Sequence, residues 1–139
     1  MLRQIIYVSA CLRPDFREEV KPLLDTTHRN NSANGVTGVL AYANRCFLQV
    51  LEGPPDTVEQ TFERIGRDPR HRVIEVLSDE LVETRCFSDW SMAWRDLPAD
   101  DPLAAKIKSV SKGEEIEHAR DALVASILDG FLEDSAKTA

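Results

Sequence analysis

The sequence is poor in the residues from which small metal and disulfide sites are built. Its three cysteines, Cys11, Cys46 and Cys86, are odd in number and widely spaced. They form neither a paired CxxC metal site nor a secreted disulfide framework. The three histidines also lack metal-ligand spacing. We therefore expect no metal site and interpret the thiols as buried or incidental.

Common enzyme motifs are absent as well. The chain has no GxGxxG, no GxxxxGK phosphate loop, no HExxH and no GxSxG nucleophile elbow. Its acidic residues are spread over helix faces, as solvated charge usually is. The spacing of the residues therefore identifies no enzyme.

Long apolar runs and an excess of basic charge are also missing. No apolar run approaches the roughly 20 residues that span a bilayer. The N-terminus leads directly into the apolar segment 5–8, without a signal-peptide cleavage pattern. The net charge of −7 argues against nucleic acid, because phosphate binding needs clustered Lys and Arg. We expect a cytoplasmic protein that binds neither membranes nor nucleic acid.

What is present is a chain of 139 residues, 42% hydrophobic and 29% charged, which suits one globular domain. Alternating and apolar segments predict strands over 4–9, 36–43, 46–51, 73–77 and 90–95. The dipeptide Asn44-Arg45 joins the second and third of these in a tight hairpin. A helix is predicted over 56–67, with Val58, Phe62 and Ile65 on one face.

An earlier helix is predicted from Pro14, with an apolar face that includes Phe16 and Val20. The polar stretch 26–34 is expected to end it, with Gly35 as the stop. The resulting order is β-α-β-β-α-β-β. It predicts an α+β, ferredoxin-like sandwich with one added strand and both helices on one face of a mixed sheet.

The composition changes after Leu97. Residues 98–102 read as a linker, followed by a short helix and a longer one over 114–132. We therefore expect a domain over 1–97 and a helical C-terminal extension over 98–139. The apolar stripe of the longer helix has two interpretations: it packs on the bare face of the sheet, or it forms a dimer or partner surface.

Two polar residues stand out in strands that should be buried. Gln49 shares a strand face with Phe47 and Leu51, and a buried amide must find hydrogen-bond partners or cost a few kcal/mol. Rotating such an amide exchanges its acceptor and donors. Tyr7, on the first strand, is a candidate to point at the same sheet face. Each residue alone is also compatible with an ordinary core position.

Five segments, taken in order, resemble the signature of the BLUF family. They are YVS at 7–9, the stretch 31–38 with Asn31 and GVTG, FLQVLEG at 47–53, IGRDPRH at 65–71 and RCFSDWSM at 85–92. The resemblance covers roughly residues 3–95. It implies a ferredoxin-like domain that binds FAD non-covalently, with the flavin ring between the two helices on one sheet face.

The resemblance also implies roles for residues. Tyr7 would donate an electron and a proton to the photoexcited flavin, and Gln49 would hydrogen-bond both groups and rotate or tautomerise in the light. Asn31 would hold the polar edge of the ring, while Asp68, Arg70 and His71 would lie near the ribityl and phosphate tail. The full set implied to bind the cofactor is Asn30, Asn31, Leu40, Phe47, Gln49, Ile65, Asp68, Arg70 and His71. Asn30 stands where some members carry His, which should alter ring packing more than chemistry.

The fifth strand is the expected relay for the signal. Trp90, Met92 and Trp94 share one face by period two. In the family, the residues matching Trp90 and Met92 compete for the space near the glutamine. The other interpretation is that all three are core residues.

The resemblance thus predicts a blue-light photoreceptor that is not an enzyme and signals to a separate protein, with a homodimer as a further possibility. Two alternatives stay open. One is a small ferredoxin-like hydrolase of the acylphosphatase type, although no Gly-rich anion loop with a basic residue precedes the first helix. The other is a binding module without a chromophore.

Overall fold

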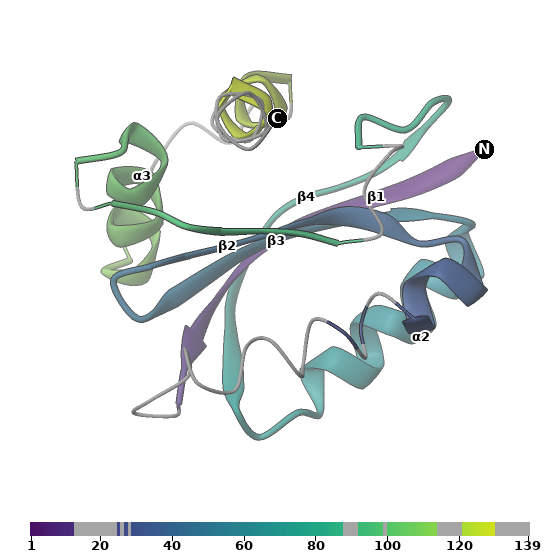
Figure 1. The fold of residues 1–139 in the computed structure, drawn as a ribbon, viewed down its shortest axis with the longest axis horizontal. Helices are drawn as coiled ribbons and strands as arrows, with labels where there is room; N and C mark the ends of the chain where they lie inside the picture. Colours follow the sequence, from purple (N-terminus) through teal and green to yellow (C-terminus); the bar gives the residue numbers. More distant parts are fainter. Residues whose placement is uncertain are drawn as a thin grey trace.

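The computed structural model describes residues 1–12, 25, 27, 29–87, 92–98, 100–113 and 121–129. These residues build a sheet in the order β4-β1-β3-β2-β5, with helices on both of its faces (Figure 1). All neighbouring strands are antiparallel except β2 and β5, which run parallel. The predicted α+β, ferredoxin-like class with one added strand is confirmed.

Strands β1 (Leu2–Cys11) and β3 (Cys46–Gly53) form the centre of the sheet, and every residue of β3 is buried. Strand β2 (Thr37–Ala43) joins β3 through the predicted hairpin. Asn44 and Arg45 both have positive φ angles, 53° and 62°, as a two-residue turn of this twist requires.

Two corrections concern the outer strands. Strand β4 runs from His71 to Val82, well beyond the predicted end at residue 77. It pairs with β1 along its whole length, so its polar second half is held by backbone bonds that the side-chain pattern does not reveal. Strand β5 is Ala93–Asp96, so Met92 of the predicted strand precedes it, while the predicted residues 90 and 91 lie outside the described residues.

The helices on the cavity side of the sheet are α2 (Pro55–Gly66) and the helical residues 29–34. The polar stretch that was predicted to end the first helix is itself helical over 29–34, and the helix stops at Gly35, where φ is 72°. The predicted stop at Gly35 is confirmed. The expectation that the polar stretch itself ends the helix was wrong, because Asn30 and Asn31 of this stretch line a cavity from a helix. The predicted start of this helix lies outside the described residues.

The opposite face of the sheet is covered by α3 (Pro102–Ser111) and by helical residues 121–129 (Figure 1). Side chains from both, including Ile107 and Ile127, share one apolar cluster with Ile6, Val8 and Leu48 of the sheet. For the described residues, the C-terminal stripe therefore packs on the chain's own sheet. Among the helices of the described segments, none has the length and apolarity to cross a membrane.

Candidate functional site

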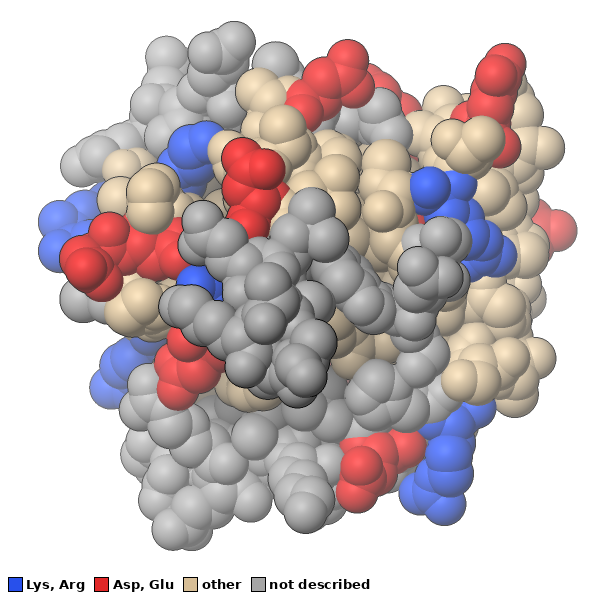
Figure 2. All heavy atoms as spheres, turned by 45° about the horizontal axis from the view of Figure 1, so that its top comes forward, with Lys and Arg blue, Asp and Glu red and all other residues tan. Residues whose placement is uncertain are grey.

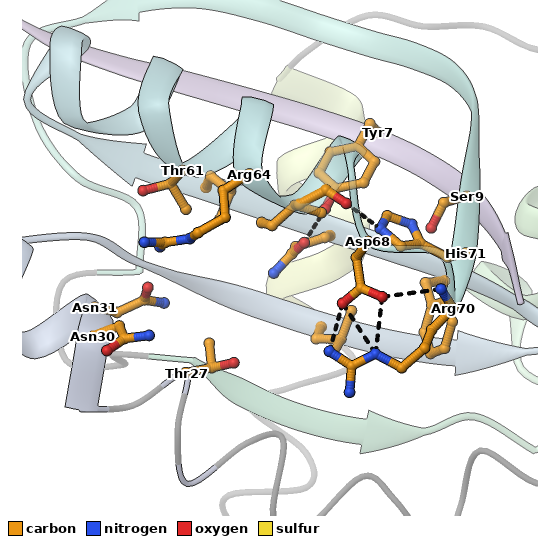
Figure 3. Close-up of a pocket in the computed structure, with 15 residues that line it drawn as sticks. Tyr7, Ser9, Thr27, Asn30, Asn31, Thr61, Arg64, Asp68, Arg70 and His71 are labelled. Atoms are coloured by element: carbon orange, nitrogen blue, oxygen red, sulfur yellow. Dashed lines mark hydrogen bonds and ion pairs between the residues drawn. The ribbon is translucent and has the colours of Figure 1, made fainter.

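A cavity of about 290 Å³ lies on the face of the sheet that carries α2 (Figure 3). The wall includes residues of strands β1, β2 and β3, of helix α2 and of the turn and the start of β4 that follow it, together with Thr27, Asn30 and Asn31. Every residue that the sequence predicted to bind the cofactor lines this cavity: Asn30, Asn31, Leu40, Phe47, Gln49, Ile65, Asp68, Arg70 and His71. Tyr7 lines it too.

The register of the two central strands brings Tyr7 and Gln49 together. They are direct partners across the antiparallel β1–β3 pair, so both side chains leave the sheet on the same face. The Tyr7 hydroxyl donates a hydrogen bond to Gln49 Oε1, and Gln49 Nε2 donates to Met92 Sδ at 3.5 Å. Phenol, amide and thioether therefore form a buried row, of which Tyr7 and Gln49 line the cavity and Met92 lies behind Gln49.

The surroundings of Tyr7 keep its phenol neutral. The side chain is 1% exposed, and this burial raises the pKa of Tyr7 far above its ordinary value. The ring of Phe62 meets it edge-on, with centroids 5.1 Å apart and planes at 75°, a favourable aromatic geometry. Tyr7 is therefore protonated and able to donate the hydrogen bond to Gln49.

The amide of Gln49 has two usable orientations. In the observed one, its oxygen faces a donor and its nitrogen faces a weak acceptor, the Met92 sulfur. Turning the amide over would present its nitrogen to Tyr7 and its oxygen to Met92. The hydroxyl of Tyr7 can accept as well as donate, but the thioether cannot donate, so the contact with Met92 would be lost.

Charged groups lie at another end of the cavity. Arg70 Nε donates to Asp68 Oδ1 at 2.9 Å and Oδ2 at 3.0 Å, and the Arg70 backbone N–H donates to Oδ1 at 2.9 Å. The hydrogen bond from Arg70 lowers the pKa of Asp68. His71 Nε2 donates to the Ile65 carbonyl at 2.6 Å, which fixes the ring.

Asn30 and Asn31 lie across the cavity from this charged group, on the helical residues 29–34 (Figure 3). Asn31 is 2% exposed, and its backbone carbonyl accepts from Val36 N at 2.9 Å as the helix ends. This bond closes the end of the helix on which Asn31 lines the cavity.

Five lining residues were missed by the sequence analysis: Ser9, Thr27, Leu51, Thr61 and Arg64. The signals were available, because Ser9 and Leu51 follow Tyr7 and Gln49 by two residues on the same strand faces. On α2, Thr61 lies four residues before Ile65 and therefore on the same helix face. Arg64 directly precedes Ile65. In Figure 3 the guanidinium of Arg64 extends away from the Asp68–Arg70 pair.

Of the three residues on the predicted relay face, the structure describes Met92 and Trp94. Met92 is 1% exposed and contacts Gln49. Trp90 lies outside the described residues. Trp94 stacks on Tyr42, with ring centroids 6.3 Å apart, in a small cluster with Leu40 and Phe47 of the cavity wall.

Comparisons with known proteins agree with this geometry. A family model described as BLUF, sensors of blue-light using FAD, matches residues 2–93. The photoactivated adenylate cyclase subunit beta of Euglena gracilis is 33% identical over 92 residues, 66% of this chain and 11% of that protein. The blue light- and temperature-regulated antirepressor BluF of Escherichia coli (strain K12) is 32% identical over 109 residues, 76% of this chain and 27% of that protein.

A solved structure is similar over nearly the whole chain. It is the dark state of BlrB, a BLUF protein, with a TM-score of 0.75 and 26% sequence identity. The match covers 93% of this chain and 96% of BlrB. By contrast, the chain spans 11% and 27% of the two curated relatives.

Proposed function

This chain belongs to the BLUF family, the sensors of blue light that use FAD, and from that premise we propose how its own residues perform the sensing. Tyr7 and Gln49 would border the bound flavin ring in the cavity, and light would rearrange the hydrogen bonds of the Gln49 amide. The observation that carries the proposal is the buried Tyr7–Gln49–Met92 row, whose first two members line the cavity.

The chemistry of the cavity wall fits a flavin. An isoalloxazine ring is flat and largely apolar, with one edge of amide-like donors and acceptors. Leu40, Phe47 and Ile65 supply apolar wall, and the amides of Asn31 and Gln49 supply groups that complement such an edge.

The two arginines at the cavity suit the phosphates of the FAD tail. Arg70 is held in place by Asp68 but keeps a third of its side chain exposed, so it can reach an anion outside the cavity. Arg64 lines the cavity from α2. We assign the ribityl and phosphate neighbourhood to Asp68, Arg70 and His71, with Arg64 as an added cation.

Bound FAD supplies the blue-light absorption and, once excited, the oxidising power. The residues of the chain do the rest. Tyr7 would donate to the excited flavin one electron and the proton that its hydroxyl shares with Gln49 Oε1. Both would return to Tyr7 within the same light-driven cycle, so the flavin stays oxidised and only the hydrogen bonds of the Gln49 amide stay changed until the dark. During this exchange the Gln49 amide turns over or tautomerises, and its bond to Met92 Sδ is released.

Release of Met92 passes the change to strand β5, which begins at the next residue. We infer that residues 1–97 form the sensor and that residues 98–139 form the helical extension that carries the signal onward. The chain is then a non-enzymatic regulator in the cytoplasm, acting on a separate protein or a second copy of itself. The names of the relatives, a cyclase subunit and an antirepressor, support an effector outside this domain.

The visible absorption spectrum, recorded in darkness and then under blue light, tests the proposal. We expect a flavin spectrum that shifts slightly to the red without bleaching and recovers in the dark. Bound flavin that does not shift would remove the Tyr7–Gln49 mechanism. No visible absorption, even after FAD is added back, would instead indicate a binding module without a chromophore.

A further inference from the structure

Strand β5 is the element next to the photochemical row, and it lies at an edge of the sheet. It follows Met92 directly and pairs in parallel with β2, Val39 opposite Ala93. An edge strand bonded to one neighbour is easier to displace than a central one, because fewer backbone bonds hold it. A displacement of Met92 should therefore move β5, together with the groups that contact this strand.

One ion pair attaches β5 to the helix on the other face of the sheet. Arg95 Nη1 donates to Asp101 Oδ2 at 2.9 Å, and the two side chains are 10% and 13% exposed. Arg95 belongs to β5, and Asp101 is the N-cap of α3. The contact thus joins the strand beside the cavity to the first turn of α3.

The two oxygens of Asp101 have separate tasks. Oδ2 accepts from Arg95, while Oδ1 accepts from the backbone N–H of Leu103 at 2.8 Å, which satisfies one of the free donors at the start of the helix. The same carboxylate therefore begins α3 and holds β5. A shift of Arg95 pulls on the residue that fixes where the helix starts.

Helix α3 is able to carry such a pull across the molecule. Leu103, Ala104, Ile107 and Val110 are each no more than 2% exposed, in the core on the opposite face. Close packing of this kind moves as a unit rather than deforming gradually. Lys106 of α3 also donates to Ser126 Oγ at 2.9 Å, so the next helix is attached to it.

We propose that Arg95 and Asp101 are positioning residues that couple strand β5 to the N-terminus of α3, and so deliver the light signal from the cavity face to the helices on the opposite face. The inference rests on the proposed photochemistry. A nearly buried ion pair contributes little net stability, so fixing the position of β5 relative to α3 is its main physical effect.

Hydrogen exchange of the α3 backbone amides, followed by mass spectrometry on the FAD-loaded chain in darkness and under blue light, tests this coupling. Arg95→Met removes the pair and leaves the cap. Asp101→Asn keeps the cap oxygen for Leu103 but turns an amide NH₂ toward Arg95, so it also breaks the pair. Arg3→Met is the matched control, because it cuts another Arg–Asp pair, to Asp79 at 2.7 Å, between β1 and β4.

In the unmodified chain we expect illumination to change exchange over α3. Arg95→Met and Asp101→Asn should retain bound flavin and the full red shift but lose the change over α3. Arg3→Met should retain both, and Arg95→Lys, which keeps a charged donor, should restore the α3 response. The coupling alone would be overturned if the two pair-breaking variants showed the red shift and also the same light-induced change in α3 exchange as the unmodified chain. Absence of any red shift in the unmodified chain would overturn the photochemistry and the coupling together.

Discussion

The two faces of the sheet are built from alternate residues of the same strands, yet they differ in what they bury. On the face under α3, Ile6, Val8, Leu48 and Val50 meet apolar helix side chains in a filled core. On the other face, Tyr7 and Gln49 border a cavity of about 290 Å³. One face stabilises the fold, and the other leaves room and polar groups for a ligand.

Two buried glutamines sharpen this comparison. Gln4 lies on β1 and is 0% exposed, and its Nε2 donates to Glu52 Oε2 at 3.0 Å. That carboxylate also accepts the backbone N–H groups of Cys86 and Phe87, so turning the Gln4 amide would leave a carboxylate facing its oxygen. Gln49 lies between a hydroxyl and a thioether, where turning is possible. A buried amide is therefore not a switch by burial alone. Whether it can turn depends on whether its hydrogen-bond partners tolerate the exchanged donor and acceptor.

The largest expected effect is at Tyr7. Tyr7→Phe removes the proton and the donor while keeping the aromatic ring, so we expect complete loss of the light-induced red shift with flavin still bound. Absorption spectra before and after blue light measure this. Tyr42→Phe, the same change at a ring outside the row, should leave the red shift intact; if both variants behave alike, Tyr7 has no special role.

On the filled face, Ile107→Ala should act on stability alone. Ile107 is 0% exposed in the core, so the truncation should lower the free energy of unfolding by about 2–5 kcal/mol. Denaturant titration measures it, with Val76→Ala as the control, because Val76 is 42% exposed and should change stability by no more than about 0.5 kcal/mol. The red shift per bound flavin should be unchanged, and a reduced one would mean that the faces are not separable.

Glu52→Gln tests whether the Gln4 partner is structural. The substitution turns a donor toward groups that already donate, so unfolding free energy should fall by about 1–3 kcal/mol. Glu83→Gln, at an exposed position, is the matched control for denaturant titration. We expect Glu52→Gln to keep the red shift. If the variant bound flavin normally but lost the red shift, Gln4 and Glu52 would also take part in signalling.

The smallest effect is expected for the cofactor tail. Arg70→Gln removes one charged donor at the cavity, which should weaken FAD binding about tenfold. Titration of flavin-free protein with FAD, followed by flavin fluorescence, gives the dissociation constant. Arg67→Gln removes an arginine whose side chain is 79% exposed and pairs with Glu63. Equal affinities for the two variants would place the phosphates elsewhere.

Sequence patterns could predict the elements and the faces but not the register. Alternation placed Gln49 on the same face as Phe47, and Asn44-Arg45 marked the hairpin. Tyr7 meets Gln49 because β1 and β3 pair in one register, which backbone bonds determine and a single strand's pattern does not contain. The resemblance to a known family supplied that pairing.

The same limit explains what was missed. No role was predicted from the sequence for Gln4, Glu52, Arg95 or Asp101, and only the fold reveals that Gln4 meets Glu52 and that Arg95 meets Asp101. The helix over 29–34 was missed for a related reason, because its polar side chains resemble those of a loop, and only the fold shows that Asn30 and Asn31 line a cavity. Local propensity gives way to tertiary contacts at these positions.

The central claim is that Gln49 is the buried amide that responds to light. Light-minus-dark absorption spectra of Gln49→Leu and Gln4→Leu, measured in parallel on flavin-loaded protein, test it most directly. The account predicts that Gln49→Leu binds flavin and shows no red shift, while Gln4→Leu binds flavin and keeps it. A normal red shift in Gln49→Leu would contradict the account.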